Sequence, residues 1–188
     1  MILPIVCYGN NILRRHCDTV SPDDPTIMNL IKDMWETLNA ADGCGLAAPQ
    51  VNRSLKLFVV NSRDTYLNMG NQARQLYFEG DTGIEETFIN AEIIEYGDEE
   101  VADDEGCLSM PDLSETVNRS WRITVKYHDR QFREQIRTFS GYTPRVIQHE
   151  YDHTLGILYI DRLSALRKQL LRNRLKKMQK GIKRVKFQ

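Results

Sequence analysis

Apolar side chains recur along this chain at two different spacings, and each spacing predicts a different element. Between residues 24 and 43, apolar positions repeat every three or four residues, which predicts a core-facing amphipathic helix opened by Asp24 and ended by Gly43. The same spacing after Ser164 predicts a C-terminal helix that ends at Gly181. The apolar stripe of that helix consists of Leu166, Leu170, Leu171, Leu175 and Met178.

A third helix is predicted between these two. Thr143 would cap it and Pro144 would lie in its first turn, where proline is well tolerated. Val146 and Ile147 would anchor this helix to the core, and Gly156 would end it.

Extended segments fill much of the middle of the chain. Residues 55–60 have the composition of a strand, and residues 87–96 that of a strand pair or one bent strand. Residues 122–127 alternate strictly between apolar and polar positions and residues 132–139 do so loosely. This alternation predicts an antiparallel hairpin with its turn at residues 128–131.

Two segments fit neither pattern well. Residues 62–83 are polar and irregular, which predicts a long surface excursion, and residues 157–160 form a short extended run. The fold class that follows is α+β, with antiparallel sheets packed around a central helix and with an N-terminal and a C-terminal helix. Residues 1–163 would form the body, and residues 164–188 a basic helix and tail of the same domain.

Length and composition agree with one soluble globular domain, because the chain has 188 residues of which 41% are hydrophobic and 27% charged. The apolar start, residues 1–6, is too short for a secretory signal and lacks its basic flank. No later run reaches membrane-spanning length. We therefore expect a cytoplasmic protein without a membrane partner.

The four cysteines show no paired spacing of the kind that a zinc ribbon, a redox pair or a disulfide scaffold needs. Cys7, Cys17 and Cys44 are expected to be small buried apolar residues. Cys107 is the exception, since Gly106 and Ser109 flank it in a segment predicted to be a loop.

The third helix carries a His-Glu-x-x-His pattern. His149 and His153 lie four residues apart and so share one helical face, from which both can reach a single metal ion. Glu150 is beside them, where it can move protons for a water molecule at that ion. The alternative is a pair of histidines on a solvated helix face.

A catalytic divalent site usually needs a third protein ligand and one open position. No histidine follows His153, and the other two, His16 and His128, are expected to be structural or solvated. The Cys107 thiolate is the better candidate.

Residues 43–50 are mostly small and include two glycines, which allow the backbone to approach another group closely. A phosphate-binding loop lacks support here because the Lys-Ser/Thr ending of that motif is absent. A plain tight turn remains open. Gln50, a polar amide at the end of the run, is a candidate site residue.

Taken together, these segments resemble the three ordered signatures of the peptide deformylases: residues 43–50, 105–109 and 148–153. The resemblance extends to residues 2–6 and 156–162, so it covers most of the chain. Departures from the family pattern fall outside the proposed ligands; they are Asn11, Asn52, Thr154 and the long excursion at residues 62–83.

The resemblance implies a hydrolase that removes the N-formyl group from the formyl-methionine of nascent polypeptides and releases formate. It assigns Cys107, His149 and His153 to the metal and makes Glu150 the group that takes a proton from water and delivers it to the departing amine. A thiolate and two imidazoles suit iron, zinc or nickel by softness. The resemblance implies Fe2+ in the cell, with Zn2+ or Ni2+ possible in purified protein.

The remaining roles also come from the resemblance. The Gln50 side-chain amide and the Leu108 backbone N–H would stabilise the oxyanion. Gly45 would contact the peptide through its main chain, and Glu105 would hold a loop beside the ligands.

The tail is basic and the body acidic. From Arg162 to Gln188 there are eleven Lys or Arg residues and no Asp or Glu. These charges either solvate the outer face of a helix or, as the resemblance suggests, attract ribosomal RNA and bring the enzyme to the emerging chain. No DNA partner is expected.

Two other classes remain as alternatives. A zinc peptidase would share the helix and Glu150 but would cleave internal peptide bonds. A non-enzymatic RNA-binding protein would use the tail and hold the metal for structure alone.

Overall fold

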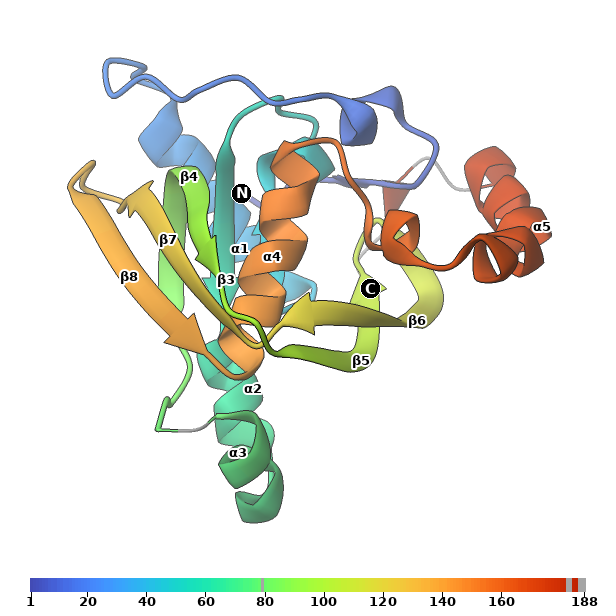
Figure 1. Ribbon diagram of the computed structural model, residues 1–188. Helices are drawn as coiled ribbons and strands as arrows, with labels where there is room; N and C mark the ends of the chain where they lie inside the picture. The colour runs from blue at the N-terminus through green and yellow to red at the C-terminus, as the bar shows by residue number, and fades with distance from the viewer. Residues whose placement is uncertain (79, 182–183, 186–188) are drawn as a thin grey trace.

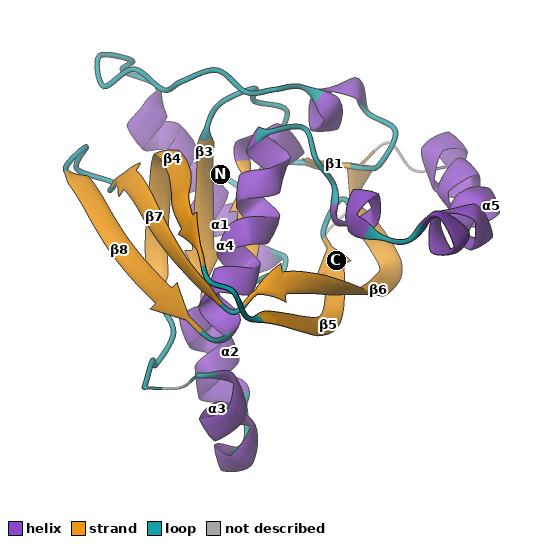
Figure 2. Ribbon diagram, viewed as in Figure 1, coloured by secondary structure: helices purple, strands orange, loops and turns teal. Residues whose placement is uncertain are grey.

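A central helix, α4 (Tyr142–Thr154), lies between a five-stranded sheet and a separate two-stranded hairpin in the computed structural model (Figure 1). The structure describes residues 1–78, 80–181 and 184–185. In this part of the chain helices and antiparallel strands are mixed, so the predicted α+β class is confirmed (Figure 2).

The five-stranded sheet has the order β2-β3-β4-β7-β8, and all its neighbours are antiparallel. Its strands are β2 (Gly45–Ala47), β3 (Leu57–Asn61), β4 (Glu85–Tyr96), β7 (Arg122–His128) and β8 (Glu134–Ser140). The register of β7 and β8 runs from Arg122 opposite Ser140 to His128 opposite Glu134, which confirms the predicted hairpin. β4 is one strand with two register shifts against β7, so the bent strand is the correct alternative for residues 87–96.

Helices α1 (Ile27–Ala40) and α4 cover opposite faces of this sheet. Successive residues of a strand point to opposite faces. Leu57 and Val59 accordingly pack in the cluster with α1, whereas Phe58 and Val60 pack in the cluster with α4. Each layer of core is therefore specified by alternate positions of β3.

α1 begins three residues after the predicted opening. The Asp24 carboxylate accepts hydrogen bonds from the backbone N–H and the hydroxyl of Thr26 at 2.9 and 2.7 Å, so it orders the turn before the helix. The fully buried apolar side chains of α1 are Ile27, Ile31, Met34 and Leu38, as the spacing predicted.

α4 begins earlier than predicted, and Thr143 is not its cap. The N-cap position is Gly141 at φ 86°, and Thr143 lies buried in the first turn. The Thr143 hydroxyl instead hydrogen-bonds the Ser62 hydroxyl at 2.8 Å and Asp81 at 3.1 Å.

The C-terminal end of α4 is as predicted. Gly156 has φ 74°, a left-handed conformation that suits glycine. Its N–H donates to the His153 carbonyl at 3.2 Å, and the Ile157 N–H donates to the Asp152 carbonyl at 3.0 Å. This pair of bonds closes the helix directly after its second histidine.

The second sheet, formed by β5 (Glu100–Cys107) and β6 (Met110–Ser120), was not predicted. β6 alternates between buried and exposed positions, but its buried side chains include Glu115 and Arg119. A pattern of hydrophobic residues alone therefore does not predict this strand. Cys107 ends β5, so the expectation that it lies in a loop was wrong.

Residues 62–83 are not an irregular excursion, which corrects the expectation. They contain α2 (Ser62–Asn68) and α3 (Asn71–Tyr77), which extend away from the sheet (Figure 1). The Asn61 side chain caps α2 by accepting from the Asp64 N–H at 3.1 Å. Each helix has seven residues, too few for a clear apolar period.

α5 (Ala165–Gly181) lies at the side of the molecule beyond β6 (Figure 1). The Ser164 hydroxyl accepts from the Arg167 N–H at 3.2 Å, so the predicted cap is confirmed. The predicted stripe is only partly buried, because Leu171 is 6% exposed whereas Leu166 and Leu170 are 68% and 65% exposed.

The remaining elements are short. They are β1 (Ile5–Val6), which pairs with β9 (Arg184–Val185), and the 3-10 turns η1 (Asn11–Arg14), η2 (Ala48–Val51) and η3 (Tyr159–Arg162). η3 replaces part of the extended run predicted at residues 157–160. None of the helices in the described part of the chain combines the length and apolar character needed to cross a lipid bilayer.

Candidate metal centre and catalytic cleft

Three side chains that could bind a metal ion converge where β5 ends against α4. His149 and His153 lie one turn apart on α4, with ring centroids 5.1 Å from each other. The Cys107 Sγ lies 3.4 Å from the His153 Nε2. One ligand atom from each of Cys107, His149 and His153 lies within 4.8 Å of the other two.

This donor set fits a divalent metal ion. Glu105 Oε2 accepts from the His149 Nδ1 at 3.0 Å, which fixes the ring and leaves Nε2 for a metal. Burial and the neighbouring His149 lower the pKa of His153 well below its usual value, so that ring is neutral, the form that binds metals. One thiolate and two imidazoles leave a fourth tetrahedral position open, as catalytic sites require.

His149 holds a proton more strongly than His153 does. Burial alone would lower the pKa of His149, but hydrogen bonding to Cys107 and Glu105 raises it well above its usual value. A metal ion that binds the His149 Nε2 therefore displaces a proton.

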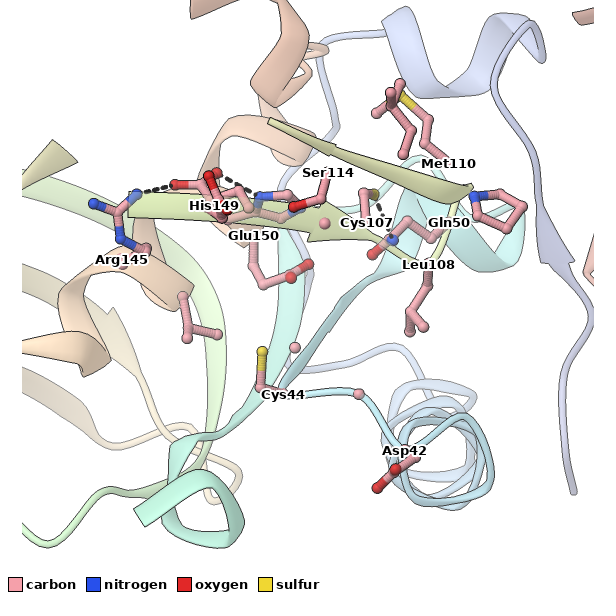
Figure 3. A pocket seen from close by; sticks show the side chains of 18 of the residues that line it. Asp42, Cys44, Gln50, Cys107, Leu108, Met110, Ser114, Arg145, His149 and Glu150 are labelled. Atoms are coloured by element: carbon pink, nitrogen blue, oxygen red, sulfur yellow. Dashed lines mark hydrogen bonds and ion pairs between the residues drawn. The ribbon is translucent and has the colours of Figure 1, made fainter. Parts of the chain in front are cut away.

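Glu150 points into the cleft beside these ligands (Figure 3). It is 4% exposed, and its Oε2 has no hydrogen-bond partner among the described residues. Burial raises the pKa of Glu150 to about 7. A carboxyl group with that pKa can both accept and return a proton at neutral pH.

Gly45 makes room for this carboxylate. A Cβ atom at Gly45 would lie 2.4 Å from the Glu150 Oε1 and 2.7 Å from its Cγ. The small residues of the 43–50 segment, which form β2 and η2 rather than only a tight turn, thus let β2 and α4 approach each other.

Gln50 is held from both ends of its amide. Its Oε1 accepts from the Ala47 N–H at 2.7 Å, and its Nε2 lies 3.6 Å from the Cys107 Sγ. Gln50 is 1% exposed, and these two contacts orient its amide at the cleft.

Seven of the eight predicted site residues line one cleft of about 490 Å³: Gly45, Gln50, Glu105, Cys107, Leu108, His149 and Glu150 (Figure 3). His153, 1% exposed, is outside this lining but within reach of Cys107. His16 is exposed and His128 ends β7, so neither belongs to the group of ligand atoms.

The expectation for the other cysteines needs one correction. Cys7 and Cys17 are 2% and 4% exposed, as expected of small core residues. Cys44 is only half-buried and lines the cleft, with its Sγ 3.7 Å from the Tyr142 hydroxyl.

Sequence reasoning missed the charged residues behind the ligands. Arg119 donates to both oxygens of Glu105, at 2.8 and 2.9 Å, and to Asp152 of α4. Burial would raise the pKa of Glu105, but Arg119 and His149 hold it well below its usual range. The Glu105 carboxylate therefore stays ionised and keeps its bond to His149.

Comparison with known proteins agrees with this geometry. The sequence model of the polypeptide deformylase family matches residues 2–169. The chain belongs to the polypeptide deformylase family. This family consists of hydrolases that remove the N-formyl group from nascent peptides, so the predicted resemblance is confirmed.

Individual deformylases show how far the similarity extends. The peptide deformylase of Christiangramia forsetii is 40% identical over 185 residues, covering 96% of this chain and 91% of that protein. That of Salinibacter ruber is 42% identical over 181 residues, covering 96% and 90%. The crystal structure of the Ehrlichia chaffeensis peptide deformylase has a TM-score of 0.81 at 31% identity, covering 96% of this chain and 98% of that one.

Proposed function

We propose that this chain removes the formyl group from formyl-methionine at the start of nascent polypeptides in the 490 Å³ cleft, with one divalent ion held by Cys107, His149 and His153. The observation that carries the proposal is the convergence of these three donors beside the buried carboxylate of Glu150, whose Oε2 has no hydrogen-bond partner among the described residues. Family membership supports the reaction.

The ion would supply Lewis acidity, which lowers the pKa of water at the site to about 7. We propose Fe2+ as the ion in the cell and Zn2+ or Ni2+ as possible occupants after purification. Metal analysis and assay of anaerobically prepared protein test this choice, and a zinc form as active as the iron form would contradict it.

Glu150 would move the proton. It takes one from the attacking water as oxygen bonds to the formyl carbon, and it delivers that proton to the peptide nitrogen as the C–N bond breaks. Formate and a free amine are the products. The raised pKa of Glu150 and its position on the cleft wall support this role.

Three further residues would orient the substrate and its developing charge. The Gln50 Nε2 and the Leu108 backbone N–H would donate to the oxyanion, and the fixed Gln50 amide supports that role. Gly45 would contact the peptide through its main chain while leaving space for Glu150. Glu105 would act through His149, whose Nδ1 it binds.

The decisive test is formate release from formyl-Met-Ala-Ser. Glu150→Gln should lower kcat by about 10²- to 10⁴-fold, because general acid–base catalysis is lost. Bound metal per protein should not change, since Glu150 is not a ligand. Cys107→Ala should lose both metal and activity.

The same assay separates the alternatives. A zinc peptidase would cleave the internal bonds of unformylated Met-Ala-Ser. A protein that uses its metal only for structure would show no formate release, and Glu150→Gln would change nothing. Either result would overturn the proposed function.

We further propose that the enzyme works in the cytoplasm and reaches the emerging chain through α5. Its exposed Arg172, Lys176 and Lys180 lie four residues apart and form a basic row. Replacing all three with Gln should weaken ribosome binding and make that binding less dependent on salt concentration. Unchanged binding would contradict this role.

Packing of Leu171 with residues of β6 and η3 supports including residues 164–188 in the same domain as residues 1–163.

A further inference from the structure

Arg145 lies one helical turn before His149 on α4 and buries its guanidinium group rather than exposing it. The residue is 6% exposed. Residues four apart share a helix face, so Arg145, His149 and His153 form one row along α4. Figure 3 shows Arg145 at the end of the cleft, joined by a dashed line to the carboxylate that also contacts His149.

The guanidinium group joins α4 to both strands of the β5–β6 hairpin. Its Nη1 donates to the Val117 carbonyl of β6 at 2.9 Å, and its Nη2 donates to the Val101 carbonyl of β5 at 2.5 Å. A longer bond of 3.4 Å reaches the Asp103 carbonyl. Because Cys107 ends β5 and both histidines lie on α4, these bonds connect the two pieces of chain that carry the ligands.

The same group also fixes the carboxylate of Glu105. Arg145 Nη1 donates to the Glu105 Oε1 at 2.7 Å, where Arg119 Nε also donates at 2.8 Å. The other oxygen accepts from Arg119 and from the His149 Nδ1. A carboxylate offers about four acceptor positions, so all of them are used and its orientation is determined.

We propose that Arg145 is a positioning residue for the metal centre: it fixes the hairpin that bears Cys107 against α4 and orients Glu105 toward His149. The inference rests on the proposed function for the identity of the metal site. It assigns Arg145 no contact with the substrate, although its side chain adjoins the cleft.

The test measures Co2+ affinity of metal-stripped protein by competition with a chelator. Arg145→Met should lower the affinity about 10- to 100-fold, the usual loss when a group that orients metal ligands is removed. The thiolate-to-cobalt absorption band should weaken with it, because Cys107 is no longer held against α4. Arg145→Lys keeps one charge near Glu105 but cannot bridge both strands. Its Co2+ affinity should therefore fall between those of the wild type and Arg145→Met.

Arg167→Met is the matched control. Arg167 binds Glu115 of β6 through two hydrogen bonds but comes from α5, so it ties the same hairpin to a helix without ligands. Its loss should leave Co2+ affinity within about twofold of the wild type. An equal loss in this variant would overturn the inference, as would wild-type affinity in Arg145→Met. Should the Met variant fail to fold, Arg145→Lys decides: at least threefold weaker Co2+ binding supports the proposal, and wild-type binding overturns it.

Kinetics at saturating Co2+ distinguish positioning from substrate contact. For formyl-Met-Ala-Ser, Arg145→Met should lower kcat and leave KM within about twofold. A raised KM with unchanged kcat would mean that Arg145 binds substrate, and would overturn the inference. If the wild type binds Co2+ but releases no formate, the proposed function fails while the affinity series still decides the role of Arg145.

Discussion

Helices α4 and α5 are both rich in charged and polar residues, but those residues are mostly buried in α4 and mostly exposed in α5. Eleven of the thirteen residues of α4 are buried, including Arg145, Glu150 and Asp152. In α5 the basic side chains stay in water, and Leu171 alone among its described residues is fully buried. Composition therefore does not decide which helix enters the core.

Partners of opposite charge make the difference. Asp152 of α4 is held by Arg119 and Arg162, and Glu105 is held by Arg119 and Arg145. Burying an unpaired charge is very costly, whereas a buried charge with full hydrogen bonding is tolerated. The basic residues of α5 have no comparable set of acids in the described structure beyond the Arg167–Glu115 pair. Glu150, which has no such partner in the described part of the chain, is the group expected to act in catalysis.

The largest test of this contrast is Arg119→Met. It should lower the free energy of unfolding by about 3–5 kcal/mol, because Glu105 and Asp152 would both lose their shared buried partner. Urea denaturation of the variant and the wild type measures the change. Arg162→Met is the control: its side chain is 37% exposed and binds only Asp152 of this pair, so its loss should be clearly smaller. Equal losses would mean that burial of the partner does not matter.

The same contrast explains what the sequence could predict. The helix at residues 142–154 was found because Val146 and Ile147 could anchor it to the core and the two histidines lie one helical turn apart. The candidate ligands followed from chemistry that depends on spacing alone. The family resemblance added Leu108 and Glu105, which no periodicity identifies, and gave Gln50 its role.

The β5–β6 hairpin could not be found in this way. Its inward positions include Glu105, Glu115 and Arg119, so a hydrophobic pattern reads them as surface. Glu105 and Arg119 pair with each other, but they also need partners far along the chain: Asp152 binds Arg119 from 33 residues away, and Arg167 binds Glu115 from 52 residues away. The error at α5 is the reverse, since Leu166 and Leu170 fit an apolar stripe but meet no core.

Leu171→Ala tests how α5 is held. Leu171 packs in one cluster with Leu113, Val117 and Tyr159, and its truncation should cost about 2–3 kcal/mol of unfolding free energy. Leu170→Ala is the matched control on the next residue, 65% exposed, and should change stability by less than about 0.5 kcal/mol. Thermal and urea unfolding of both variants measure this difference. Similar effects at the two positions would mean that the stripe as a whole, rather than Leu171, attaches the helix.

A third charged site, at the turn that joins β7 to β8, is intermediate between the buried, paired charges of α4 and the exposed charges of α5. Asp129 is 5% exposed, and its Oδ1 accepts from the backbone N–H groups of Gln131 and Arg133 at 2.9 and 3.0 Å. Its Oδ2 accepts from the Arg133 Nε at 2.9 Å and from the Gln135 Nε2 at 3.1 Å. Burial would raise the pKa of Asp129, but these bonds outweigh it and lower the pKa.

Asp129→Asn should therefore have the smallest effect, about 1 kcal/mol at neutral pH, because a neutral amide oxygen replaces an ionised acceptor of several hydrogen bonds. A depressed pKa in the folded state means that the contribution is complete above the ordinary aspartate pKa of about 3.9 and is lost as the pH falls through the folded value. The difference in stability between wild type and variant should stay constant from pH 8 to about pH 5 and shrink below about pH 4. Urea denaturation across this pH range measures the difference in stability. The control is Asp98→Asn at an exposed aspartate, for which the difference should not change with pH. A difference that instead grows as the pH falls would mean that protonation of Asp129 stabilises the turn, and that its charge is tolerated there rather than used.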